Sequence, residues 1–162
     1  MKPKTDFKFQ IFIRFPSIDS NSTAAILCSS GSTGFPKGIC KSHKQTISDF
    51  HLLWPLKNGK TQVTFQASPI FWVSGFYILV SATLYRCVRV ITTQALNPQL
   101  IFDILNNYKV SVYLTQPYTI VALMQLEDFK PIESMQCMLI GGSVISSKSC
   151  EYCSEFSSLI FT

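Results

Sequence analysis

A loop of small residues that ends in proline, lysine and glycine constrains the fold of this chain more than any other feature. It reads Ser29-Ser30-Gly31-Ser32-Thr33-Gly34-Phe35-Pro36-Lys37-Gly38. The apolar run at 24–28 comes directly before it, as a buried strand would. Between a strand and a helix, such a loop presents backbone N–H groups and hydroxyls to an anion, and Lys37 adds a charge that can reach phosphates. The sequence therefore predicts a phosphate-binding loop.

Two alternatives account for the loop less well. It is not a Walker A motif, because that motif needs Ser or Thr after its lysine, and here Gly38 follows Lys37. A flexible linker of Ser and Gly would have no use for proline, lysine and glycine after the small residues. Phosphate binding is the interpretation that accounts for the whole loop.

Segments with a strand pattern and segments with a helix pattern alternate along the chain. Strands are predicted at 24–28, 61–67, 88–92, 111–114 and 137–140, and helices at 42–54, 74–85, 97–108 and 117–125. Alternation of this kind favours parallel strands joined by right-handed crossovers. We therefore expect an α/β fold, with a layered parallel-sheet subdomain over residues 23–162 after an irregular lead-in at 1–22. The Ser-rich tail at 146–162 shows no helix cap or turn.

The composition favours a domain whose surface is largely covered by other protein. Charged residues make up 14% of the chain, against about 25% in an average soluble domain. The net charge is +5, but no Arg-rich run or basic helix accompanies it, so we do not expect nucleic acid as a partner. A mildly basic surface around an anionic nucleotide is the simpler interpretation.

The cysteines indicate a reducing, intracellular compartment and no metal site. Six of them are scattered along the chain, mostly in apolar runs where a free thiol behaves as a small hydrophobe. Cys150 and Cys153 have the spacing of a redox or zinc pair, but no second pair exists, and His43 and His51 are the two histidines of the chain. We expect a cytoplasmic or peroxisomal protein, since no signal peptide is visible at the N-terminus.

The uncharged segment from Thr61 to Tyr85 is long enough to cross a bilayer. Polar residues and a change of period inside the segment favour a buried strand, a turn and a buried helix instead. A membrane-associated protein built on this segment stays open as an alternative, although we do not expect a membrane partner.

At the loop of residues 29–38 the sequence resembles the adenylate-forming (AMP-binding) superfamily, which contains acyl-CoA synthetases, 4-coumarate-CoA ligases and firefly luciferase. The resemblance is strongest to the insect luciferase-like acyl-CoA synthetases. The phosphate loop of that superfamily has the same small residues followed by Pro-Lys-Gly. The resemblance extends from about Thr23 to Ile145. Lys41-Ser42-His43 lies where the superfamily has a histidine after the loop, 68–76 resembles its acyl-pocket segment, and 139–143 resembles the strand and turn beside adenine.

The resemblance implies an AMP-forming acid-CoA ligase that uses ATP, Mg²⁺ and coenzyme A. Such an enzyme activates a fatty or aryl carboxylic acid as an acyl-adenylate and then passes the acyl group to a thiol. The implied phosphate-binding residues are Ser29, Ser30, Gly31, Ser32, Thr33, Gly34, Lys37 and Gly38. Gly141, Gly142 and Ser143 would border adenine and the acid, and Phe71, Trp72 and Phe76 would line the acyl pocket. For these aromatic residues, plain hydrophobic core is an equal alternative.

Three departures from the superfamily limit what this chain alone is expected to do. Far fewer residues precede the loop than in the superfamily. The sequence also lacks three parts of the superfamily: the Tyr-Gly-x-Thr-Glu segment with its Mg²⁺ ligand, the later ribose-binding aspartate and the domain with the catalytic lysine. In addition, Trp72 stands where many CoA ligases have histidine. We therefore expect a partial large N-terminal domain with no complete catalytic set and no activity by itself. A nucleotide-binding remnant without catalysis is the main alternative.

Overall fold

A five-stranded parallel sheet forms the centre of the structure. The computed structural model describes residues 17–29, 34–53, 61–144 and 158–161. Within these ranges the sheet has the order β4-β3-β5-β6-β7, and every neighbouring pair is parallel. Its strands are β3 (Val63–Gln66), β4 (Val88–Val90), β5 (Val112–Thr115), β6 (Cys137–Ile140) and β7 (Ser158–Phe161). The predicted α/β fold with a parallel sheet is confirmed.

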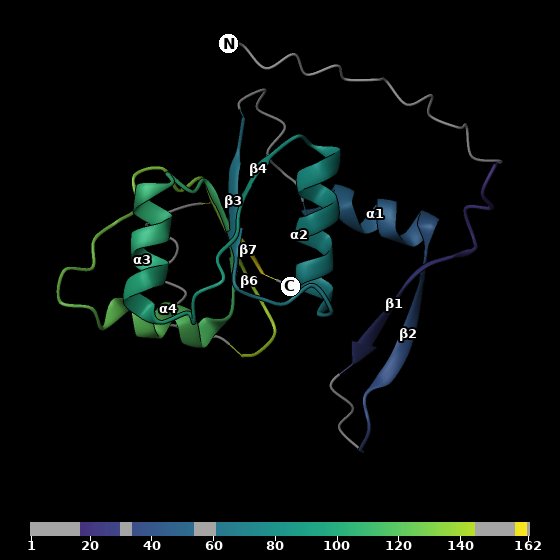
Figure 1. Cartoon of the computed structure of the whole chain (residues 1–162), viewed down its shortest axis with the longest axis horizontal. Helices are drawn as coiled ribbons and strands as arrows, with labels where there is room; N and C mark the ends of the chain where they lie inside the picture. The colour runs from purple at the N-terminus through teal and green to yellow at the C-terminus, as the bar shows by residue number, and fades with distance from the viewer. Residues whose placement is uncertain (1–16, 30–33, 54–60, 145–157, 162) are drawn as a thin grey trace, which may run out of the picture.

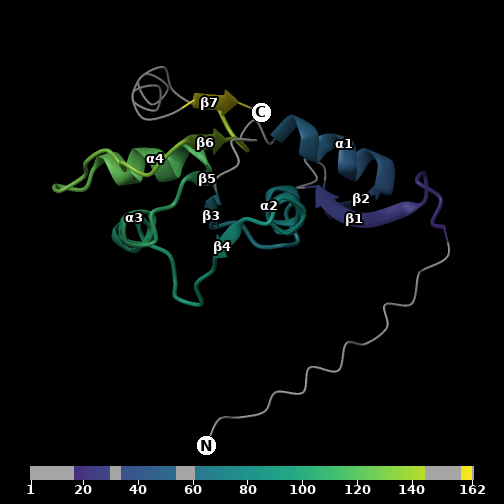
Figure 2. The same cartoon turned by 90° about the horizontal axis from the view of Figure 1, so that it is seen from above.

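Helices cover both faces of this sheet, so the molecule is layered. Helix α2 (Val73–Leu84) lies on one face, and α3 (Pro98–Asn107) and α4 (Pro117–Met124) lie on the other (Figures 1 and 2). The uncharged segment 61–85 is thus a strand, a turn and a helix, as predicted. In the described part of the chain, no helix is long and apolar enough to span a bilayer.

Alternation along the strands divides the core into two clusters. Phe65, Tyr113 and Met138 pack with α3 and α4, and the rings of Phe65 and Tyr113 stack with centroids 5.7 Å apart. Val112 and Leu139 point to the other face, where they pack with Ile78 of α2. Side chains of adjacent strand residues point to opposite faces, so near-continuous apolar strands supply both clusters.

Polar side chains cap two of the helices. The Asn97 side chain accepts a hydrogen bond from the backbone N–H of Leu100 at 2.8 Å, and Pro98 occupies the first turn of α3. Before α1 (His43–Leu53), the Ser42 hydroxyl accepts from the N–H of Gln45, and the Gln45 side chain accepts from the N–H of Ser42. This reciprocal pair is a capping box, and it fixes the start of α1 as predicted.

The predicted order of strand, loop and helix around residue 30 is wrong in one respect. Strand β1 (Thr23–Ser29) pairs antiparallel with a second strand, β2 (Lys37–Ser42), before α1 begins. The loop therefore connects two strands of a hairpin that extends away from the main sheet (Figure 1). Strand β1 is also mostly exposed, since Ile26 is 66% exposed and Leu27 is its one buried residue. A two-stranded ribbon has no second layer to cover its outer face, which explains this exposure.

The structure also bears on the cysteines and on the tail of the chain. Cys28 and Cys40 lie on the hairpin and are exposed, whereas Cys137 is buried in the main sheet. The tail contains a strand that was not predicted, since β7 pairs with β6 in parallel register. The possible pair Cys150 and Cys153 lies outside the described residues.

Candidate functional site

A cavity of about 580 Å³ lies between the β1–β2 hairpin, the start of α2 and the carboxyl ends of β5 and β6. Its lining residues are Leu27, Cys28, Ser29, Ile39 and Lys41 of the hairpin, Ser68, Trp72, Val73 and Ser74 around the start of α2, Leu114, Thr115 and Gln116 at the end of β5, and Gly141 and Gly142 after β6. The volume falls within the usual range for ligand pockets. Ligands of parallel α/β sheets bind beyond the carboxyl ends of the strands, which is where this cavity lies.

One face of the hairpin forms a wall of the cavity. The register pairs Leu27 with Ile39 and Ser29 with Lys37, so alternate residues of both strands share that face. The Ser29 hydroxyl donates to the carbonyl oxygen of Lys37 at 3.4 Å, which ties the two sides of the loop together. Ser29 is thus the phosphate-loop candidate that the structure places in the cavity wall.

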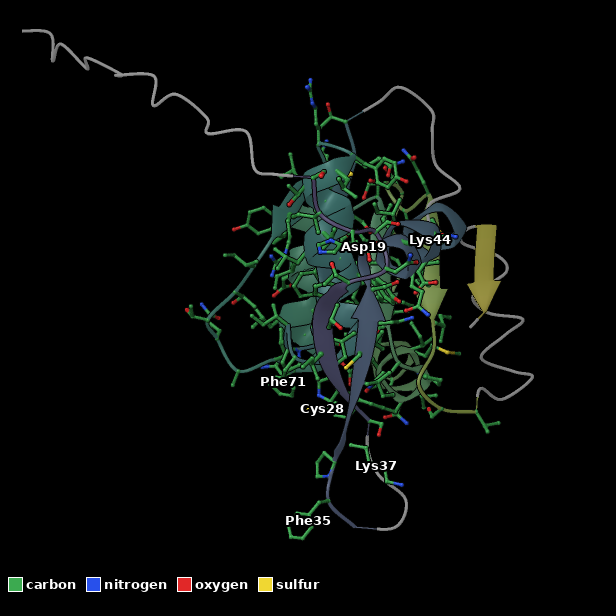
Figure 3. All side chains as sticks on the ribbon, turned by 90° about the vertical axis from the view of Figure 1, so that its right-hand side faces the viewer. Asp19, Cys28, Phe35, Lys37, Lys44 and Phe71 are labelled. Atoms are coloured by element: carbon green, nitrogen blue, oxygen red, sulfur yellow. The ribbon has the colours of Figure 1, made fainter. Side chains whose placement is uncertain are left out.

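The rest of the described loop lies at the far end of the hairpin. Figure 3 shows Phe35 and Lys37 there, and the Phe35 side chain is 93% exposed. Gly34 has φ of +137°, a conformation that favours glycine. Gly34, Lys37 and Gly38 do not line the cavity in this structure, and the candidates at 30–33 lie outside the described residues.

The start of α2 brings an indole and a helix terminus to the cavity. Trp72 lines the cavity and stands at the N-cap of α2, where no side chain caps the helix. The uncapped N–H groups and the helix dipole favour negative charge at this end. Phe71 is 62% exposed and Phe76 lies beside the ring of Tyr77, and neither lines the cavity.

The turn after β6 lies at the carboxyl edge of the sheet. The N–H of Gly141 donates to the carbonyl oxygen of Thr115 at 3.2 Å, which continues the pairing of β5 and β6 by one residue. Gly142 has φ of +91°, so this turn needs a residue that tolerates a left-handed conformation. Gly141 and Gly142 line the cavity, whereas the third candidate, Ser143, is exposed and does not.

A cluster of three polar side chains, Lys41, Asp49 and Tyr77, joins the hairpin to two helices. The Lys41 ammonium lies 2.6 Å from Asp49 Oδ2, and the Tyr77 hydroxyl donates to the same oxygen. Lys41 Nζ also lies 6.0 Å from the centroid of the Tyr77 ring. These residues come from β2, α1 and α2, so the cluster fixes the inner end of the hairpin against both helices.

The pKa shifts in this cluster keep all three groups in their usual states at neutral pH. Hydrogen bonds to Asp49 and Tyr77 raise the pKa of Lys41. Burial acts to raise the pKa of Asp49, but hydrogen bonds from Lys41 and Tyr77 outweigh burial and lower that pKa. Burial, together with the hydrogen bond to Asp49, raises the pKa of Tyr77. The cluster therefore holds an ammonium, a carboxylate and a neutral phenol.

Sequence patterns did not single out this cluster as part of a site. Lys41 lines the cavity, and of the described residues that do so it alone has a charged side chain. The described residues that line the cavity include no carboxylate, which is the ligand that Mg²⁺ prefers. We therefore assign no Mg²⁺ ligand among them. The one local signal is that Lys41 lies two residues after Ile39, so both side chains fall on the same face of β2.

A family model and several curated proteins match most of this chain. The family model described as "AMP-binding enzyme" matches residues 4–158. Acetyl-coenzyme A synthetase 1 of Saccharomyces cerevisiae is 25% identical over 91% of the chain, and 2-succinylbenzoate–CoA ligase of Bacillus subtilis is 26% identical over 83%. The chain spans only 22% and 28% of the lengths of these two relatives.

Solved structures show the same fold. The luciferase-like enzyme of the nonluminescent mealworm Zophobas morio matches 90% of the chain with a TM-score of 0.73 and 22% identity, and the match covers 35% of that enzyme. O-Succinylbenzoate coenzyme A synthetase of B. subtilis, solved with ATP and a magnesium ion, matches 93% of the chain with a TM-score of 0.75 and 22% identity, over 32% of its own length.

Proposed function

Because the chain belongs to the AMP-binding enzyme family, we propose that it is part of a ligase that activates a carboxylic acid with ATP. The acid would become an acyl-adenylate, and coenzyme A would then take the acyl group as a thioester. The names of two relatives, acetyl-coenzyme A synthetase and 2-succinylbenzoate–CoA ligase, support this reaction class. A fatty or aryl acid is the substrate class that we propose for the whole protein.

One observation carries the proposal. Three segments that the family resemblance assigns to different parts of an adenylate site line a single cavity, through Ser29, Trp72 and Gly141 with Gly142. These segments are far apart in the sequence, and a plain structural core would have no reason to collect them around a space of about 580 Å³. The convergence supports one composite site for nucleotide and acid.

In this proposal the hairpin loop holds the phosphates of ATP, which supplies the adenylyl group when bound. Ser29 and Lys37 face each other across the hairpin and would hold the phosphates together with the residues at 30–33, while Gly34 and Gly38 allow the backbone to come close. Lys37 lies on the exposed part of β2, where its long side chain can reach a phosphate. Its charge would be the main attraction for the triphosphate.

The acid would lie deeper, against Trp72. Its indole ring offers a large apolar surface, and the uncapped start of α2 favours the negative carboxylate. Gly141, Gly142 and Ser143 form the turn that would separate the acid from adenine. Neither Phe71 nor Phe76 lines the cavity in this structure. Their proposed role in the acyl pocket therefore requires their side chains to move toward the cavity.

A nucleotide-binding protein without catalysis is the second candidate. It is favoured by the lack of any carboxylate among the described residues of the cavity wall, because a catalytic site would use one to hold Mg²⁺ near the phosphates. The two candidates agree on nucleotide binding and differ in whether an acyl-adenylate forms.

Two measurements on the chain separate these candidates. Titration with a fluorescent ATP analogue should show saturable binding that Lys37→Ala weakens at least tenfold, whereas Lys44→Ala, a change of an exposed lysine on α1, should leave binding unchanged. Exchange of pyrophosphate into ATP with a panel of acids then tests catalysis. Binding without exchange would favour the noncatalytic candidate for this chain, and no binding by the wild type would overturn both.

A further inference from the structure

We propose that Lys41 makes the cavity selective for acids that carry a second carboxylate, at the end of the molecule away from the reacting one. The inference rests on the proposed function, because it assumes that an acid occupies the cavity. It concerns a residue outside the phosphate loop and outside the aromatic segment. The ligand class is an aliphatic or aryl dicarboxylate whose second carboxylate binds the Lys41 ammonium.

The position of Lys41 is the first support. It lines the cavity together with Trp72, and it supplies the charge in an otherwise neutral described wall. Its side chain is 26% exposed, so the ammonium is neither free in solvent nor sealed in the core. A partly buried cation at the inner end of an apolar cavity is a binding group for an anion.

The neighbours of Lys41 hold the ammonium in place without using all of its donors. An ammonium group has three N–H donors, and Asp49 and Tyr77 engage two of them. The third donor is available to a ligand that enters from the cavity. Because Asp49 and Tyr77 fix the lysine rotamer beforehand, a ligand would not have to order that flexible side chain itself.

Distance along β2 separates this cation from the phosphate loop. Lys37 and Lys41 are four residues apart on the same face of β2, which corresponds to about 13 Å at the usual rise of a strand. An acid whose reacting carboxylate lies near the loop would therefore extend its other end toward Lys41. A monocarboxylate would place a hydrocarbon end against the charged cluster, whereas a dicarboxylate would place an anion there.

A purely structural role for Lys41 is the competing explanation. The pair with Asp49 could do no more than fix the hairpin to α1, as many partly exposed ion pairs do. The two explanations differ in what the ligand must contain. A structural lysine gives no preference for a second carboxylate, and its loss lowers stability for all ligands alike.

The experiment compares octanedioate with octanoate, which match in length and differ in one carboxylate. Binding is followed by the fluorescence of Trp72 in a background in which Trp54→Phe removes the other of the two tryptophans. The variants are Lys41→Met, Lys41→Arg as a charge-preserving rescue, and Lys44→Met as a matched control on the exposed face of α1. Thermal melting of each variant reports stability separately.

The expected result is that wild type prefers octanedioate at least tenfold, that Lys41→Met removes this preference, and that Lys41→Arg and Lys44→Met keep it. Equal binding of the two acids by wild type overturns the inference even if Lys41→Met fails to fold. Equal weakening of both acids by a folded Lys41→Met also overturns it. Binding of ATP is measured in parallel, so a wild type that binds ATP but shows no preference for octanedioate rejects this inference and leaves the proposed function standing.

Discussion

Gly75 lies against the carbonyl oxygen of Pro69, so close that a Cβ atom on Gly75 would come within 2.0 Å of that oxygen. The same Cβ would lie 2.6 Å from the Pro69 carbonyl carbon and 2.8 Å from Ile70 Cα. All three atoms belong to the backbone, so no side-chain rotation can relieve the clash. This contact sets the first turn of α2, and with it Trp72, against the turn that leads into the helix.

Gly75→Ala should therefore destabilise the protein strongly. Overpacking against rigid atoms costs about 1–3 kcal/mol, and we expect a value at the upper end because backbone must move. Urea denaturation measures the change in the free energy of unfolding. Thr83→Ala, a change at an exposed position of the same helix, should alter it by less than about 0.5 kcal/mol. Equal stability of the two variants would show that the Pro69 turn yields easily.

The capping box at the start of α1 makes a second prediction. Ser42→Ala removes the hydroxyl that accepts from the Gln45 N–H, and it should cost about 1 kcal/mol of unfolding free energy. Thermal denaturation with matched controls measures this loss. Ser42→Asp keeps an acceptor at the cap and should retain most of the stability, whereas a loss as large as that of alanine would contradict a capping role.

The acid response of stability should depend on Asp49. Its pKa is lowered from the ordinary value of 3.8 in the folded state, so its contribution is present above pH 3.8 and is lost as the pH falls through the lower folded pKa. The difference in unfolding free energy between wild type and Asp49→Asn should shrink below pH 3.8. Glu127→Gln, at an exposed position outside the cluster, serves as the control. A difference that is constant from neutral to acid pH would contradict the prediction.

Position 72 makes the last prediction, which concerns catalysis in a complete enzyme. Indole can only donate a hydrogen bond, whereas imidazole can donate, accept and change charge near neutral pH. A luciferase-like synthetase that carries residues 70–76 of this chain should form acyl-adenylate slowly, and Trp72→His in that chimera should speed it by roughly ten- to a thousandfold. Initial rates of pyrophosphate release measure this. Equal rates would mean that the indole only packs.

Elements whose side chains follow one strong period could be predicted from the sequence. The alternation of strands and helices after residue 60 is confirmed, and α3 begins at the Asn97-Pro98 signal. Strand β2 could not be predicted, because Ile39 and Cys40 are its only apolar residues and its pairing with β1 is a backbone interaction. Strand β7 was missed because a short edge strand at the end of a Ser-rich stretch carries a weak pattern.

The candidate site could be predicted only where a local motif marks it. The loop was found from its own residues, the aromatic segment and the Gly-Gly turn were found from the family resemblance, and each contributes a residue to the cavity wall. Lys41, Asp49 and Tyr77 were not found as a group, because no spacing rule joins a strand residue to residues of two separate helices. Their meeting depends on how the hairpin packs, which the sequence pattern does not encode locally.

The hairpin has its own hydrogen-bond ladder, and this separates its dynamics from those of the sheet. Among the described strands, β1 and β2 pair only with each other. Opening them need not break the core, so their amide protons should exchange with solvent as a cooperative unit of lower stability than β5 and β6. A ligand that contacts the hairpin and the sheet edge together would join the two units. When a ligand is added, amide exchange should then slow in β1 and β2, and this slowing by itself would report that the site is occupied.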